Sequence, residues 1–263
     1  MSPKWFLLLG ICLQSFLVAW DRPTTLHALI IKNTSEPNGK IASTADANRM
    51  TELLQAISRK GKLQLKLTSL DINRLGPSTF ESWIRSIKKN SVVFMYYSGA
   101  PRKSSEKTDW PSITFHGCMC QWGHPLSQER FTKRILKQDP KLAIVLFDCY
   151  TKPLSTSHHL STPGCFKGRL PNVKALFLRN KGYIMAASVP ENGCFACSTT
   201  HEPLGGVFTT KFLSGLHHVA KSPGSAWSNM THVMYGCAGC SASGVRKHFA
   251  FNITSEVPCH HYR

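Results

Sequence analysis

Cysteine and histidine are the residues of this chain whose types and spacing most directly suggest chemistry. The sequence holds 10 cysteines and 12 histidines. Two Cys-x-x-Cys pairs, Cys194 with Cys197 and Cys237 with Cys240, could together supply four thiolates to a tetrahedral zinc ion. The pairs stand further apart than the roughly 15 to 20 intervening residues of the usual paired-knuckle pattern. Disulfide bonds are therefore our first expectation for these thiols, with zinc binding and redox exchange as alternatives.

The first 19 residues have the features of a secretory signal peptide. Lys4 is followed by an uncharged, mostly apolar run from Trp5 to Ala19, which ends just before Asp21. A permanent membrane anchor usually needs about 20 apolar residues, so we expect cleavage near Ala19, export and no stable membrane span afterwards. An oxidising compartment favours disulfides. The candidates are Cys118, Cys120, Cys165, Cys194, Cys197, Cys237, Cys240 and Cys259.

Apolar runs predict the elements that would position a site. Runs without a helical period predict strands at 26–31, 92–97, 142–147, 173–177 and 183–188, and an alternating segment predicts another at 62–70. Apolar residues at three- and four-residue spacing predict helices at 44–58, 78–88 and 127–137, and a further helix from Gly205 to about Ala220. Alternating strands and helices indicate one α/β domain over 20–263. Its mostly parallel sheet should carry helices on both faces and a site at its carboxyl edge.

Two of the predicted strands end in an ordered polar pattern. Tyr96-Tyr97-Ser98-Gly99 ends one strand, and Leu146-Phe147-Asp148-Cys149 ends the next. Further matches in the same order are Ser43, Asp46 and Met50 in the first helix, Trp110-Pro111, Ala187-Ser188 and Gly206-Val207-Phe208-Thr209. Together these motifs resemble the caspase and metacaspase superfamily of cysteine peptidases, the peptidase C14-type domain. The resemblance spans most of the mature chain and implies a caspase-like three-layer sandwich.

The resemblance also implies where a catalytic dyad would stand. The family pattern Tyr-Tyr-Ser-Gly-His-Gly places its histidine at Ala100, and the pattern that ends in the nucleophilic cysteine places that cysteine at Tyr150. The separation of these positions agrees with the roughly 50 residues of caspase-type enzymes. Both catalytic residue types are nevertheless replaced, so we expect proteolytic activity to be lost.

Neighbouring residues offer substitutes for the dyad. Cys149 with His116 would form a shifted pair, although side chains alternate along a strand and Cys149 should therefore pack in the core. Tyr150 is a poor acyl acceptor, because a phenol has an ordinary pKa of about 10. The resemblance implies that Asp148 helps to line a pocket for basic side chains. A helix cap or strand-end carboxylate is the alternative role for Asp148.

The net charge of +18 favours acidic partners. Lysines and arginines are scattered, and no recognisable nucleic-acid-binding motif accompanies them. Three hypotheses follow. The first is an exported caspase-like pseudoprotease that binds a protein or peptide partner. The second is an active cysteine-type endopeptidase that uses the shifted pair, and the third is a basic surface protein that binds a polyanion. None of them calls for a cofactor or a metal.

Overall fold

The computed structural model describes residues 22–35, 37–100, 110–113, 126–150, 152–153, 170–188, 194–197, 203–230 and 247–255. The predicted signal peptide and the candidates His116, Cys118, Cys120, Cys165, Cys237, Cys240 and Cys259 lie outside these ranges. For Cys194 and Cys197 the backbone alone is described. The expected disulfides and export therefore stay predictions.

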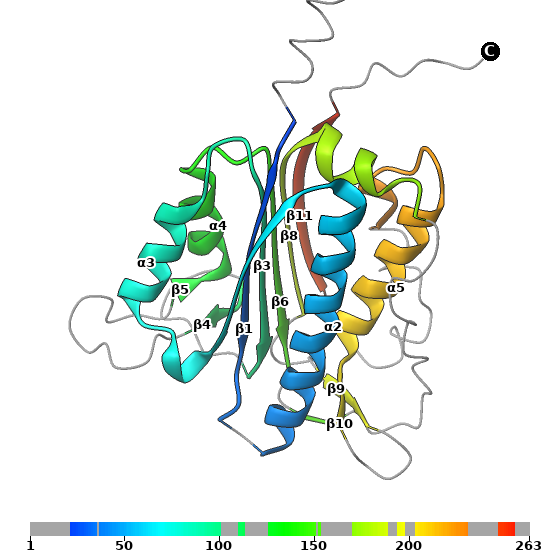
Figure 1. Cartoon of the computed structure of the whole chain (residues 1–263). Helices are drawn as coiled ribbons and strands as arrows, with labels where there is room; N and C mark the ends of the chain where they lie inside the picture. The colour runs from blue at the N-terminus through cyan, green and yellow to red at the C-terminus, as the bar shows by residue number, and fades with distance from the viewer. Residues whose placement is uncertain are drawn as a thin grey trace, which may run out of the picture.

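A six-stranded sheet in the order β11-β8-β6-β3-β1-β2 forms the centre of the fold (Figure 1). The parallel strands are β1 (Thr25–Lys32), β2 (Gln64–Asp71), β3 (Val92–Gly99), β6 (Leu142–Cys149) and β8 (Asn180–Ser188). The edge strand β11 (Lys247–Ser255) pairs antiparallel with β8. Strands β3 and β6 are buried along their whole length, which explains why their sequences are continuous apolar runs.

Helices cover both faces of this sheet, so the predicted three-layer α/β sandwich is confirmed. Helices α2 (Pro37–Gly61) and α5 (Val207–Lys221) lie on one face, and α3 (Pro77–Ser86) and α4 (Gln128–Leu136) lie on the other (Figure 1). Alternate residues of each strand serve the two layers. In β1, Leu26, Ala28 and Ile30 join the core beneath α2 and α5, whereas Leu29 and Ile31 join the core beneath α3 and α4.

The strand predicted at 173–177 was wrong, because this segment forms a helical turn that continues as η2 (Ala175–Arg179), a π-helix. Leu176 and Phe177 are buried, and the Phe177 ring packs edge-on against Trp227 with 5.2 Å between centroids. Trp227 Nε1 also donates a hydrogen bond to the Leu176 carbonyl at 2.8 Å. A short apolar run is compatible with a buried helical turn as well as with a buried strand. Here the turn is in contact with Trp227, which lies about 50 residues further along the sequence.

The remaining elements are short. They are η1 (Ile72–Arg74), β4 (Ser112–Ile113), β5 (Leu126–Ser127), β7 (Lys152–Pro153), β9 (Cys194–Cys197) and β10 (Pro203–Gly206). The first helix begins at Pro37, seven residues earlier than predicted. Its first turns were not predicted because they are polar and show no apolar period. None of the helices in the described ranges has both the length and the apolar character of a membrane span.

Candidate functional site

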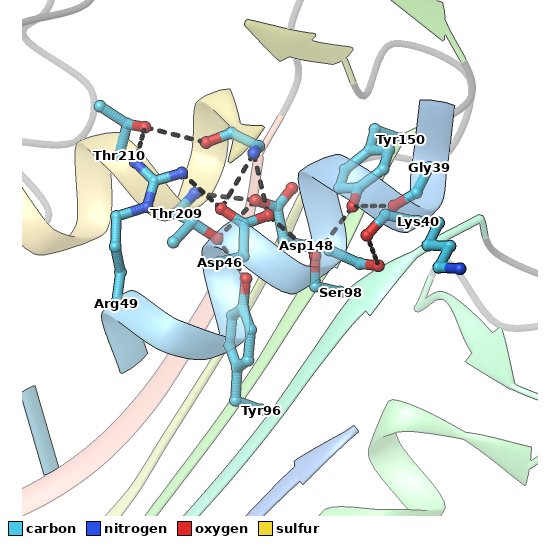
Figure 2. Close-up of polar contacts among 12 residues, drawn as sticks. Gly39, Lys40, Asp46, Arg49, Tyr96, Ser98, Asp148, Tyr150, Thr209 and Thr210 are labelled. Carbon is cyan, nitrogen blue, oxygen red and sulfur yellow. Dashed lines mark hydrogen bonds and ion pairs between the residues drawn. The ribbon is translucent and has the colours of Figure 1, made fainter. Parts of the chain in front are cut away.

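The candidate site lies at the carboxyl ends of β3 and β6, next to α2 and the beginning of α5 (Figure 2). The parallel register pairs Ser98 with Asp148 and Gly99 with Cys149. The Tyr150 amide continues this pairing by donating to the Gly99 carbonyl at 3.3 Å. Ala100 and Tyr150 therefore follow directly after the ends of two neighbouring strands.

Asp46 of α2 is a fully buried carboxylate that is satisfied by groups from two other elements and by a neighbour on its own helix. It accepts hydrogen bonds from the Gly206 amide at 2.9 and 3.1 Å and from the Ser98 hydroxyl at 2.8 Å. Arg49, one turn further along α2, forms an ion pair with Asp46 at 2.7 Å. The side chain of Asp46 thus connects α2 to the end of β3 and to the residue that precedes α5.

Asp148, at the end of β6, is also fully buried and caps α5. Its carboxylate accepts from the Thr209 amide at 2.9 Å, from the Thr209 hydroxyl at 2.6 Å and from the Ser188 hydroxyl at 3.3 Å. The first amides of a helix lack partners within the helix and carry partial positive charge. This arrangement matches the helix-capping alternative for Asp148, because the carboxylate is occupied inside the protein.

The pKa values of both aspartates are raised. Burial raises the pKa of Asp46 to about 6, although Arg49, the Gly206 amide and the Ser98 hydroxyl act in the opposite direction. Burial, followed by the negative charge of Asp46, raises the pKa of Asp148 to about 7. Two carboxyl groups that interact in this way resist being ionised together. Near neutral pH the two carboxyl groups therefore remain partly protonated, whereas exposed carboxyl groups would be ionised.

Glycine is required where the chain passes between these acids. A Cβ atom on Gly206 would overlap the Asp148 carboxylate. A Cβ atom on Gly205 would overlap the Arg49 guanidinium and the nearer oxygen of Asp46, and Gly205 has a φ of +117°. These two glycines let the backbone approach both carboxylates closely.

Tyr150 is a buried phenol within the same network. It is 2% exposed, and its hydroxyl lies 3.0 Å from the Ser98 hydroxyl and 3.5 Å from the Gly39 carbonyl oxygen. Burial, and then the charge of Asp46, raise the pKa of Tyr150 far above its ordinary value. Tyr96 lies deeper, where its hydroxyl is hydrogen-bonded to the Thr209 hydroxyl, and burial likewise raises its pKa. Both phenols are therefore protonated at neutral pH.

Ala100 contributes a backbone carbonyl to this edge of the sheet. The carbonyl accepts from the Asn33 amide nitrogen at 3.4 Å and from the Tyr97 hydroxyl. Asn33 directly follows β1, so this bond joins the ends of β1 and β3. The alanine methyl group itself offers neither a base nor an acid.

Cys149 is a free thiol on the other side of the sheet. It is fully buried in the core beneath α3 and α4, as strand alternation from Tyr150 predicts. Burial, and then the charge of Asp148, raise the pKa of this thiol well above its ordinary value. The thiol is therefore protonated and shielded from solvent.

Arg49, Gly205 and Thr210 belong to the network but were not singled out from the sequence. Arg49 also donates to the Thr210 hydroxyl at 3.2 Å, which adds a second link from α2 to α5. The one available sequence signal was the three-residue spacing of Asp46 and Arg49 on a helix. Within the described ranges, no group of three or more histidine, cysteine, aspartate or glutamate side chains is arranged to hold a metal ion.

No family model matches the chain, and no curated protein matches it. Two of the solved structures that resemble it are distant. A protein from Geobacter sulfurreducens has a TM-score of 0.44 and 14% identity, over 89% of this chain and 95% of that chain. The Drosophila initiator caspase Dronc has a TM-score of 0.39 and 8% identity, over 88% of this chain and 78% of that chain. At these values neither similarity bears on activity or ligands.

Because the pKa values of Asp46 and Asp148 are raised in the folded protein, we expect the contribution of this pair to the free energy of unfolding to fall as the pH rises. The folded protein keeps a proton on the pair between about pH 4 and pH 7, whereas an unfolded aspartate with a pKa of about 3.9 has lost it. The contribution is complete below pH 4 and is lost as the pH rises through the folded pKa of about 7. His27, whose pKa burial lowers to about 4, acts in the opposite direction up to about pH 6.5.

Asp148→Asn isolates the effect of the pair, because His27 contributes equally to both proteins. As the pH rises from about 5 to about 8, the free energy of unfolding of the variant should increase by at least about 1.4 kcal/mol relative to that of the unmodified protein. This amount corresponds to a shift of one pKa unit. Urea unfolding at a series of pH values measures this difference. Parallel stability curves for the two proteins would show that the acids have ordinary pKa values.

Gly206→Ala should destabilise the fold by about 2 to 4 kcal/mol, because the added methyl group must displace the Asp148 carboxylate or the start of α5. Gly76→Ala is the matched control, since a Cβ atom there meets only the Ser78 hydroxyl oxygen at 4.0 Å. The control should lose less than about 1 kcal/mol. Equal losses in denaturant unfolding would mean that the close approach at Gly206 is unimportant.

Proposed function

We propose that this protein is an exported caspase-like domain that does not hydrolyse peptides and that acts by binding a protein or peptide partner. The observation that carries the proposal is the pair of substitutions, Ala100 and Tyr150, at the two positions where the caspase pattern has its histidine and cysteine. The order of strands, the motifs at their ends and the adjacency of these positions support it.

Cysteine peptidase chemistry needs a thiolate nucleophile and an imidazole that accepts and returns a proton. Ala100 has no titratable group. Tyr150 would have to lose its proton before attacking a carbonyl carbon, but burial and Asp46 both keep the phenol protonated. The phenol is also hydrogen-bonded within the network rather than open to solvent. These properties support a role other than covalent catalysis.

The shifted pair of Cys149 and His116 gains no support. A reactive cysteine is accessible and has a lowered pKa, whereas Cys149 is fully buried and its pKa is raised. His116 lies outside the described residues. The export part of the proposal rests on the sequence of residues 1–19.

An assay of the purified mature protein, residues 20–263, tests the loss of activity. We expect no hydrolysis of peptides that carry Arg, Lys or Asp before the scissile bond, because no described group at the strand ends supplies a thiolate. Cys149→Ala is the control and should behave like the unmodified protein. Turnover that disappears in Cys149→Ala would overturn the proposal and favour the endopeptidase.

Restoring both family residues tests the assignment of the two positions. In the double variant Ala100→His and Tyr150→Cys, the imidazole should lower the pKa of the new thiol below its value in Tyr150→Cys alone. The rate of alkylation as a function of pH measures this, with Tyr150→Cys alone as the control. Since oxyanion donors are not rebuilt, proteolysis is not expected to return. Equal thiol pKa values in the two variants would refute the assignment.

A further inference from the structure

A second polar site lies on the same edge of the sheet, at the carboxyl ends of β1 and β2. It is an open cavity of about 540 Å³ between these strands, the beginning of α2 and η1. Its lining includes Lys32, Thr34, Lys40, Thr44, Asp71 and Arg74. Figure 2 shows the Lys40 side chain pointing away from the pair of buried acids, so this cavity is separate from that network.

Three cationic side chains line the cavity. Lys32 comes from the end of β1, Lys40 from the first turns of α2, and Arg74 from η1. Within the part of the chain that the structure describes, none of the three forms an ion pair. Like charges held close together favour a bound counterion.

The carboxylate of Asp71 is hydrogen-bonded to two other residues of the cavity lining. It accepts a hydrogen bond from the Thr34 hydroxyl. Its other oxygen accepts from the Asn73 amide at 2.9 Å, which caps η1. Both bonds come from neutral donors, so Asp71 offsets one of the three positive charges. Among the described residues that line the cavity, an excess of two positive charges is left.

The end of α2 adds to this positive field. The helix is 25 residues long and has no acidic residue in its first turn. The partial positive charge at its amino end is therefore not offset from within the helix. The hydroxyl of Thr44, on the same helix, adds a neutral hydrogen-bond donor to the cavity lining.

We propose that this cavity binds a phosphate monoester group. Such a group carries a charge of about −1.5 to −2 at pH 7 and several strong acceptor oxygens, which match the excess charge and the donors. The volume lies within the range of about 300 to 1,000 Å³ for small-molecule sites. The proposal does not depend on the proposed function, because it uses neither Ala100 nor Tyr150.

Calorimetric titration at low salt tests the proposal with inorganic phosphate and glucose 6-phosphate as probes and glucose as the uncharged control. Vesicles that contain phosphatidic acid, compared with vesicles of phosphatidylcholine alone, distinguish a lipid headgroup from a soluble ester. We expect inorganic phosphate, glucose 6-phosphate and the vesicles with phosphatidic acid to bind saturably. Glucose and the vesicles of phosphatidylcholine alone should show no binding. If inorganic phosphate, glucose 6-phosphate and the phosphatidic acid vesicles all fail to bind saturably, the proposal is overturned.

Matched charge variants separate the cavity from the general basic character of the chain. Replacing Lys32, Lys40 and Arg74 by alanine should weaken binding at least tenfold. Replacing the exposed Arg85, Lys88 and Lys137 removes the same charge near the amino ends of β3 and β6 and should change affinity less than twofold. Equal weakening in both triple variants would overturn the proposal.

Asp71→Asn provides a variant that should gain affinity. Asparagine keeps an oxygen that can accept from the Asn73 amide, while the negative charge in the cavity is removed. Binding of glucose 6-phosphate should strengthen at least threefold, with the same fold by circular dichroism. An unchanged or weakened affinity would count against the cavity as the binding site.

Discussion

The interaction on which this structure most depends is the burial of Asp46 and Asp148 at the beginning of α5. The removal of two carboxylates from water costs free energy unless hydrogen bonds or opposite charges compensate for the lost hydration. Here the compensation comes from amides at Gly206 and Thr209, from hydroxyl groups and from Arg49. These donors belong to different elements. The acids can therefore be satisfied only when α2, α5, β3 and β6 are all in place, which ties the geometry of the sheet edge to the completed fold.

The same burial determines which chemistry this edge supports. Low polarity and the nearby negative charge raise the pKa values of Tyr96, Tyr150 and Cys149, so each of these potential nucleophiles holds its proton. A peptidase needs the opposite environment, in which a positive partner lowers the pKa of the nucleophile. Among the described residues of this network, the cation is Arg49, and it is bound to Asp46. The electrostatics at Tyr150 thus agree with the substitutions in disfavouring covalent catalysis and favouring a structural use of the acids.

The sequence predicted the layers of the fold because alternating and continuous apolar runs report burial directly. It failed at 173–177, where a buried helical turn has the same composition as a strand and the deciding contact is with the distant Trp227. The motifs at the strand ends identified Ser98 and Asp148, and the further family matches in and before the helices identified Asp46 and Gly206, but the mutual contacts of these residues were not predicted. The cavity beside β1 also escaped notice, because Lys32, Lys40 and Arg74 belong to three separate elements. Side chains that meet only through topology leave no local pattern in a single sequence.

The distribution of charge at the carboxyl edge changes what this edge is expected to bind. The resemblance to metacaspases suggested that Asp148 recognises a basic side chain, yet its carboxylate is buried and occupied by Thr209 and Ser188. The accessible charge nearby is positive, at the cavity beside β1 and β2. Asn33 lies between the two regions, since it bonds to the Ala100 carbonyl and directly precedes Thr34 of the cavity. A ligand that approaches this edge therefore meets a cavity lined by three cations and one carboxylate, that of Asp71. An anionic group suits this exposed part of the edge better than the arginine or lysine of a peptide substrate.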